Sequence, residues 1–360
     1  MKIKFPGNSS GMALIVVMIA IAVFSALAAA LAFSMKVETK LARNAENEQQ
    51  LLWLGRSGVE YAKWILSQHP PAEPYDSLNQ IWAGGPGGPS ETNSPLAGIS
   101  MENFKIGDGS VSLKIVDLER FANINTAPPA LLQQALTVMG VDADSLSVVS
   151  DSIQDWRSPV APPRVAGAES DYYQSLTPPY NAKNAPIDDI SELLLVKGVT
   201  PEMYDPKTYG SGAPNSPAPQ HPKLGFGAAP GQTPDYPFGL KDVFTAVSSG
   251  KINVNTADVN VLQLIPGMDT NSAAAIIQQR AGPDGEDGTE DDTPFRDPRA
   301  ALQIAGLNAA AMAQAGNLVA VGSSTWRVNV TAQIGDAKRD FTAILYRGGA
   351  DIQVVGFYWK

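Results

Sequence analysis

The chain has 360 residues, 44% of them hydrophobic, and a formal net charge of −10 at neutral pH. Its length exceeds the roughly 100–200 residues of one domain, which predicts two globular units or one unit with a large insertion. The negative charge disfavours nucleic acid as the main partner, because Lys and Arg supply most of that affinity. The absence of cysteine excludes disulfides, thiolate metal sites and cysteine nucleophiles.

The N-terminal stretch SSGMALIVVMIAIAV, residues 9–23, opens a long apolar run. No charged residue lies between Met12 and Phe33, and a helix of that length crosses the roughly 30 Å core of a bilayer. An uncleaved signal anchor is an alternative. The alanine-rich sequence at 26–32 imitates a signal-peptide cleavage box, but the helical pattern continues past it.

Charges flank the apolar run unequally. Lys2 and Lys4 precede it, whereas Glu38, Glu46 and Glu48 follow it. By the positive-inside rule, the N-terminus is expected in the cytoplasm and everything beyond residue 36 outside the inner membrane.

Local patterns predict the elements that follow. Apolar and small residues recur at three- and four-residue spacing up to about Gln68, which predicts that the helix continues beyond the membrane. The Pro/Gly-rich segment 69–95 predicts a loop. Residues 104–118 alternate apolar and polar around an Asp-Gly turn signal, which predicts a hairpin. Residues 326–334, 339–347 and 352–360 alternate in the same way and predict three strands.

The middle of the chain contains an internal repeat. NINTAPPALLQQAL at 123–136 matches NVNTADVNVLQLIP at 253–266. Each copy predicts a helix, with the Thr126 or Thr256 hydroxyl expected to cap its first turn. Between the copies, the Pro-, Gly- and Ser-rich residues 205–239 predict a long loop or a simple linker.

The second copy also resembles the helix-hairpin-helix of membrane-anchored competence-type DNA receptors. That motif directs backbone amides, usually of a Gly-x-Gly turn, at a phosphate. Here the turn reads Pro266-Gly267-Met268-Asp269. Asp269 adds a negative charge where a phosphate would lie, so packed helices are the favoured interpretation and no nucleic-acid partner is expected.

Taken in order, the motifs are more specific than any one alone. They are Gly11-Met12-Ala13-Leu14, GRSGVEYAKWIL, the paired NxNTA blocks, DSIQDWRSP, GAESDYYQSLTPPYNAKNAPIDDISELLLVKGV and a short β-rich tail. Over nearly its whole length the chain resembles the large minor pseudopilin of type II secretion, the general secretion pathway protein K family.

The resemblance implies an α+β fold. A pilin-like long N-terminal helix and antiparallel β-sheet would carry a large inserted α-helical domain of SAM-like or helix-hairpin-helix-like type. The corresponding ranges are a leader at 1–11, a transmembrane and stalk helix at 12–68, a first β region at 69–121, the inserted domain at 122–320 and C-terminal strands at 321–360. The family also implies prepilin-peptidase cleavage after Gly11 and N-methylation of Met12.

The same resemblance implies a location and partners. The protein would be a single-pass inner-membrane protein with a periplasmic body, assembled with minor pseudopilins I and J at the tip of a pseudopilus. In ordinary pilins the fifth mature residue is a glutamate that neutralises the N-terminal ammonium of the subunit ahead. Counted from Met12, that position here is Val16. Val16 fits a subunit with none ahead, because an unpaired buried charge is costly; a simple continuation of the membrane span is the alternative.

Calcium is the one cofactor that the sequence favours. The loop PDGEDGTEDDTPF carries six carboxylates, a donor type that suits Ca²⁺, although its spacing does not fit an EF-hand; they are Asp284, Glu286, Asp287, Glu290, Asp291 and Asp292. A solvated acidic loop is the alternative. Since family members bind calcium in the helical domain, Asp155, Glu169 and Asp171 form a second candidate group, with Arg157 where many relatives have a further acid.

No catalytic site is predicted. The two histidines, His69 and His221, each precede proline in loop-like sequence, and no Walker-type phosphate loop is present. The sequence therefore predicts a non-enzymatic tip subunit of the type II secretion pseudopilus. The alternatives are a competence-type DNA receptor and a signal-anchored periplasmic binding module.

Overall fold

The computed structural model describes residues 10–68, 73–88, 91, 94–159, 162–209, 236–349 and 351–359. Most of the predicted leader, part of the loop after the first helix, most of the predicted linker at 205–239 and both histidines lie outside these ranges.

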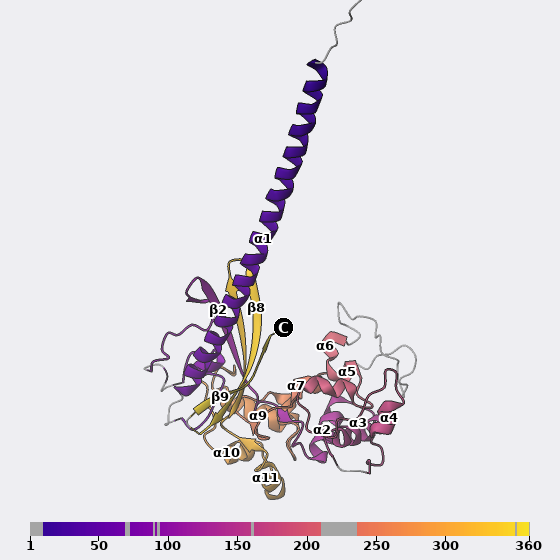
Figure 1. Cartoon of the computed structure of the whole chain (residues 1–360). Helices are drawn as coiled ribbons and strands as arrows, with labels where there is room; N and C mark the ends of the chain where they lie inside the picture. The colour runs from indigo at the N-terminus through magenta and orange to yellow at the C-terminus, as the bar shows by residue number, and fades with distance from the viewer. Residues whose placement is uncertain are drawn as a thin grey trace, which may run out of the picture.

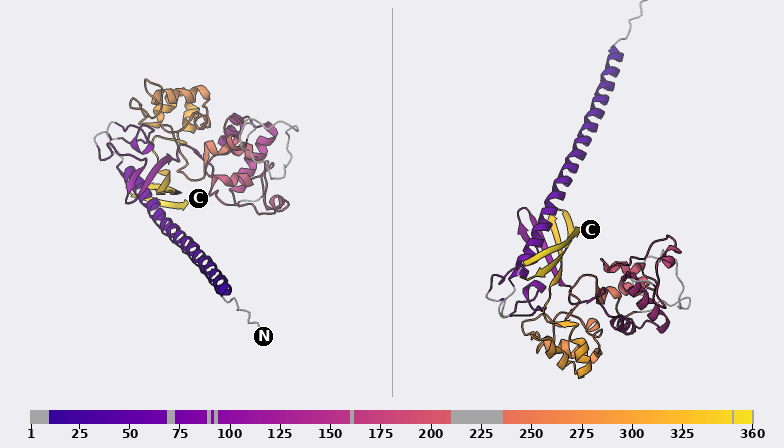
Figure 2. Two further views of the ribbon diagram at one scale, coloured as in Figure 1. Left: turned by 90° about the horizontal axis from the view of Figure 1, so that it is seen from above. Right: turned by 60° about the horizontal axis from the view of Figure 1, so that its bottom comes forward.

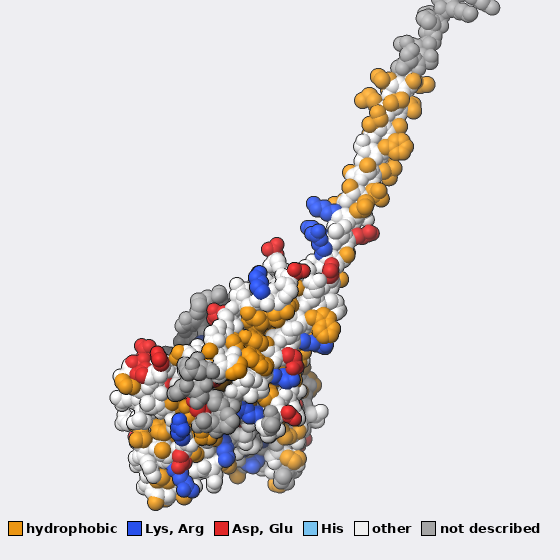
Figure 3. Space-filling view, turned by 90° about the vertical axis from the view of Figure 1, so that its left-hand side faces the viewer, with side chains coloured by type: hydrophobic (Ala, Val, Ile, Leu, Met, Phe, Trp, Pro, Cys, Tyr) orange, Lys and Arg blue, Asp and Glu red, His pale blue; other side chains and the backbone are white. Residues whose placement is uncertain are grey.

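One long helix dominates the N-terminal part. Helix α1, Ser10–Ser67, projects from the body as a single rod (Figure 1). Apolar side chains cover its far end on all visible sides, and charged side chains begin nearer the body (Figure 3). Among the described residues it is the one helix long and apolar enough to cross a membrane. Its predicted end near Gln68 is confirmed.

The second half of α1 packs on a five-stranded antiparallel sheet of order β1-β2-β7-β8-β9. Its strands are β1 Phe104–Ile106, β2 Gly109–Asp117, β7 Thr325–Ile334, β8 Ala337–Gly348 and β9 Asp351–Trp359. The predicted stripe buries Val59, Ala62 and Leu66 against alternating apolar side chains of the sheet. The α+β class, the hairpin and the three C-terminal strands are therefore confirmed, although the hairpin turn is Gly107-Asp108 and not Asp-Gly.

Everything between β2 and β7 folds outside this sheet. Asp117 at the end of β2 pairs with Trp326 at the start of β7, so the intervening chain leaves and rejoins the sheet at one place. It forms two groups of helices, best separated in Figure 2. The first group holds α2 Pro129–Met139, α3 Ala143–Trp156, α4 Ser170–Gln174, η2 Ile190–Leu195, α5 Pro201–Tyr204, α6 Pro206–Tyr209 and α7 Leu240–Val243. The second holds α8 Val259–Leu262, α9 Thr270–Arg280, α10 Pro298–Ile304 and α11 Ala309–Ala315.

The two groups are built on the same plan. Each begins with a two-residue strand that leads into an NxNTA turn and ends with a parallel partner for that strand. In the first, β3 Ala122–Asn123 pairs with β4 Phe244–Thr245; in the second, β5 Ile252–Asn253 pairs with β6 Val319–Ala320. One continuous apolar core runs through both groups.

The predicted threonine caps are wrong. Helix α2 starts after Pro128, which makes no side-chain cap, and α8 is capped by Asp258, whose carboxylate accepts from the Val261 amide. Thr256 instead donates to Asp117, on the sheet. The threonine of each NxNTA block lies in a turn, and the helix begins three residues beyond it.

Candidate functional site

The asparagines of the repeat are structural clamps. The Asn255 side chain accepts from the Phe295 amide at 2.8 Å and donates to the carbonyls of Phe295 and Val321 at 2.9 and 3.2 Å. Asn125 binds the corresponding backbone of the first group, at Ile187 and Ala246. Each repeat therefore uses one asparagine to join its entry turn to two distant segments.

An arginine completes each clamp. Arg280, at the end of α9 and only 3% exposed, donates from Nη1 to the carbonyls of Val254 and Ala257, both at 2.7 Å. In the first group, Arg157 donates to the equivalent carbonyls of Ile124 and Ala127. The role of Arg157 is thus to hold the NxNTA turn.

The acidic loop after α9 is ordered by internal contacts. Asp287 holds Arg280 through two bonds of 2.8 and 2.6 Å. Asp291 accepts from the Asp284 amide and the Thr289 hydroxyl, and these bonds lower the pKa of Asp291. Asp292 accepts from the amides of Gly288 and Thr289, while its burial raises its pKa. Glu286 and Glu290 are exposed.

The second acidic group is dispersed. Asp155 is fully buried and pairs with Arg164 at 2.7 Å. Glu169 precedes α4 without capping it, and Asp171 is exposed in the first turn of that helix. Within the described ranges, no three carboxylates or histidines of this group or of the acidic loop converge in a way that could hold a metal ion.

In the segment that resembles a helix-hairpin-helix, a carboxylate of the chain itself binds the start of the second helix. Asp269 caps α9 by accepting from the Ser272 amide at 2.8 Å, and this bond lowers the pKa of Asp269. Gly267 adopts φ +84°, which explains the glycine in the turn. The amides that would face a phosphate face Asp269.

The processing and tip positions lie on α1. Gly11 and Met12 fall in its first turns, and Val16 is 65% exposed on the rod. No acidic residue lies in the first turn. The segment therefore presents an uncharged surface to its surroundings.

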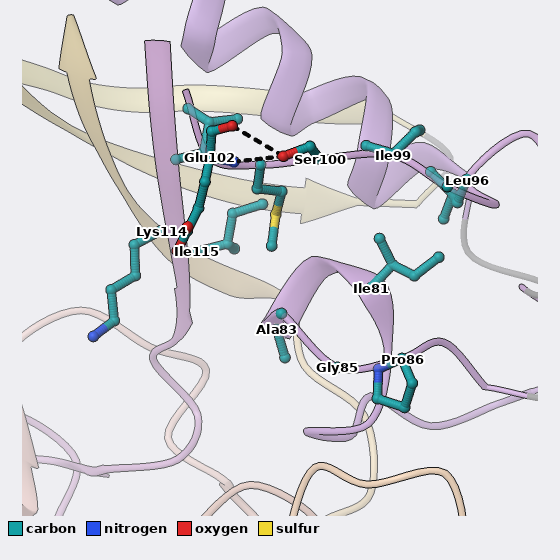
Figure 4. Close-up of a pocket in the computed structure, with 14 residues that line it drawn as sticks. Ile81, Ala83, Gly85, Pro86, Leu96, Ile99, Ser100, Glu102, Lys114 and Ile115 are labelled. Atoms are coloured by element: carbon teal, nitrogen blue, oxygen red, sulfur yellow. Dashed lines mark hydrogen bonds between the residues drawn. The ribbon is translucent and has the colours of Figure 1, made fainter. Parts of the chain in front are cut away.

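A groove opens beside the sheet, between the 3₁₀ helix η1 Ile81–Ala83, residues 96–102 and β2 (Figure 4). Ile81, Leu96 and Ile115 make its walls apolar. Ser100 bonds only the backbone of Glu102, and Lys114 extends away from both. The groove brings together no acid–base pair.

Sequence reasoning missed one cluster altogether, the buried carboxylates Asp76, Asp117 and Glu119 where the sheet meets the helices. The sequence contains one signal for this cluster, because the acids Asp117 and Glu119 of VDLER come at the end of an alternating strand. Most of their hydrogen-bond donors, however, lie far away in the sequence.

Comparisons with known proteins agree with this architecture. A family model described as type II secretion system protein K matches residues 113–206. The type II secretion system protein K of Pseudomonas aeruginosa is 24% identical over 95% of this chain and 90% of its own length. That of Aeromonas hydrophila is 24% identical over 55% of this chain, and the aligned region spans 61% of the relative.

A solved structure shares the fold. A chain in the crystal structure of the GspK-GspI-GspJ complex from the enterotoxigenic Escherichia coli type 2 secretion system superposes with a TM-score of 0.64 at 18% identity, over 89% of this chain and 99% of that one. The family-model match, the relative that aligns over most of its length and the shared fold all make this chain similar to type II secretion system protein K.

Proposed function

We propose that this protein is a non-enzymatic minor pseudopilin that caps the tip of the type II secretion pseudopilus and helps to initiate its assembly. The observation that carries the proposal is the combination on one chain of an uncharged apolar rod, a pilin-like sheet and a bulky helical domain. In the rod, Val16 occupies the position at which a subunit placed behind another one would need a carboxylate.

The proposed partners are minor pseudopilins I and J. This proposal is supported by the crystal structure of the GspK-GspI-GspJ complex, because one of its chains shares the fold of this protein. The test is size-exclusion chromatography with light scattering on the body from about residue 40, mixed with the soluble domains of I and J. We expect one ternary species. The control omits J, and separate elution of all three domains at tens of micromolar would contradict the proposal.

The proposed location is the bacterial inner membrane, with the N-terminus cytoplasmic and the body in the periplasm. Lys2 and Lys4 before the span support this orientation. Prepilin peptidase would cleave after Gly11 and leave N-methylated Met12 at the new terminus. Mass spectrometry of the membrane fraction should find that terminus; an intact Met1 or a cut near Ala30 would contradict processing.

Calcium binding by the loop from Asp284 to Asp292 is part of the proposal and is supported by its donor chemistry. It requires the carboxylates to turn toward a shared ion. At calcium one hundred times its dissociation constant, stability should rise by about 2.7 kcal/mol. The pair Asp291→Asn and Asp292→Asn should abolish the gain, whereas Asp336→Asn should not. Asp171→Asn tests the second group in the same way. Equal melting temperatures in calcium and EDTA would favour the solvated loop.

A further inference from the structure

Three connecting segments meet at one buried carboxylate cluster, where the sheet adjoins the helical domain. Asp76, Asp117 and Glu119 are each 1–2% exposed. The segments after β2 and between β6 and β7 join the sheet to the helical domain, and the segment between β4 and β5 joins the two helical groups. A change at this cluster therefore acts on both places where the chain passes between the sheet and the helical domain.

Glu119 ties all three connecting segments together. One of its carboxylate oxygens accepts from the Ser249 amide at 3.0 Å and the Ser324 hydroxyl at 2.9 Å. The other accepts from the Thr325 amide at 3.0 Å.

Asp117 ties the sheet to the second helical group. Its Oδ2 accepts from the Asn253 amide group at 3.2 Å, the Thr256 hydroxyl at 2.5 Å and the Ser323 hydroxyl at 2.7 Å. Its Oδ1 accepts from the Glu119 amide. Both residues of the NxNTA block that face the sheet thus bond the same oxygen.

The charged groups described at this cluster are mainly acidic. Within the described ranges they are Glu119 beside Asp117, Asp76 on the segment before η1, and Arg347 on β8, while β5 and the start of β7 bring uncharged donors. Arg347 pairs with Asp76 at 3.4 Å and stacks on Trp326. Burial and then the nearby carboxylate of Glu119 raise the pKa of Asp117 to about 7, with a smaller contribution from Asp76, although the hydrogen bonds from Thr256 and Ser323 act to lower it.

The hydrogen bonds around Asp117 can accommodate a proton on its carboxylate. Thr256 Oγ1 lies 2.5 Å from Asp117 Oδ2 and 3.5 Å from the Asn253 carbonyl oxygen. Since a hydroxyl rotates to suit its partners, Thr256 can turn its proton toward that carbonyl and accept one from a protonated Asp117.

We propose that the cluster of Asp76, Asp117 and Glu119 is a proton-controlled joint, which holds the helical domain against the sheet when Asp117 is protonated and loosens when that proton is lost. When the joint opens, Asp117 enters water and regains an ordinary, lower pKa. The closed joint therefore binds more protons than the open one. The stabilisation from this proton is complete below the pKa of the open state and is lost progressively as the pH rises from there through about 7.

The test measures the joint in the full chain in detergent micelles. The chain has no cysteine, so Ala313→Cys on α11 and Asp336→Cys in the β7–β8 turn accept one spin label each. We expect one narrow distance distribution at about pH 5.5 and a broader or longer one at about pH 8.5, since each pH unit between the lower pKa of the open state and about 7 favours opening by up to tenfold, and this effect levels off above 7. Asp117→Asn should stay narrow at both values, and Asp108→Asn, an exposed control, should behave as the wild type.

Identical wild-type distributions at the two pH values would overturn the proposal, as would an unchanged pH response in Asp117→Asn. If that variant does not fold, infrared difference spectra of the wild-type chain decide. The carbonyl band of a protonated carboxylic acid should disappear between these pH values; a spectrum without such a band would overturn the proposal.

Discussion

Arg157 and Arg280 occupy equivalent places in the two repeats, and neither role is visible in the sequence. The NxNTA spacing predicts that the blocks are related, because both copies preserve two asparagines, a threonine and an alanine at the same spacing. It does not predict the arginines, since each lies more than twenty residues beyond its block and the intervals differ. The carboxylates of the acidic loop after α9 suggested a metal site, but one of them, Asp287, binds Arg280. Chemistry can be inferred from residue type, whereas pairing depends on tertiary contacts.

Replacing Arg280 tests the clamp. Arg280→Met leaves two buried carbonyls without donors and Asp287 without its partner, so the free energy of unfolding should fall by about 2–4 kcal/mol. Arg280→Lys keeps the charge but cannot make the forked contacts, so its free energy of unfolding should lie between those of the wild type and Arg280→Met. The matched control, Arg299→Met on the exposed face of α10, should change stability by less than about 0.5 kcal/mol. Urea unfolding measures all three; equal midpoints for the two methionine variants would contradict the clamp.

Helix α1 and the long strands could be predicted because their periodicity extends over many residues. Helices of four or five residues, such as α5 or α8, carry too few turns to show a 3.6-residue period, so the sequence gives only their general region. The register shift between Ile344 and Leu345, which leaves Val355 unpaired, has no sequence signal either. The close approach of α1 to the sheet depends on Gly55 and Gly58, of which only Gly55 lies on the predicted stripe.

Gly58 is one of two glycines at which α1 closely approaches the sheet, and its role can be tested. A Cβ at this position would lie 2.6 Å from Val330 and 3.0 Å from Val111, both fixed in the sheet. Gly58→Ala should therefore lower stability by about 1–2 kcal/mol, although alanine improves helix propensity by about 1 kcal/mol. Ser57→Ala, one residue earlier, should be neutral or slightly stabilising. Denaturant melts of the body compare them, and a stabilised Gly58→Ala would show that α1 does not rest on the sheet here.

At the scale of the whole molecule, the order of predicted strands and repeats was enough to expect a sheet with an insertion. What could not be expected is that a buried cluster joins the insertion to the sheet, because Asp117, Thr256 and Ser323 lie far apart in the sequence. The geometry also suggests how the parts can be separated. Leu118 already donates to the Thr325 carbonyl at 2.9 Å, so an Asn-Gly turn between these residues should close β2 and β7 as a hairpin.

The last prediction uses that shortened chain to separate two causes of the proposed tip position. If the size of the helical domain excludes the protein from inner positions of the pseudopilus, removing residues 119–324 should remove that exclusion. If the missing carboxylate excludes it, Val16→Glu should supply the partner that a buried N-terminal ammonium needs. Since each feature alone should suffice, the shortened chain and full-length Val16→Glu should both stay at the pseudopilus end in immuno-electron microscopy, and only the combined variant should label along its length. Spread of either single variant would assign the position to one cause, and a combined variant that remains terminal would contradict both.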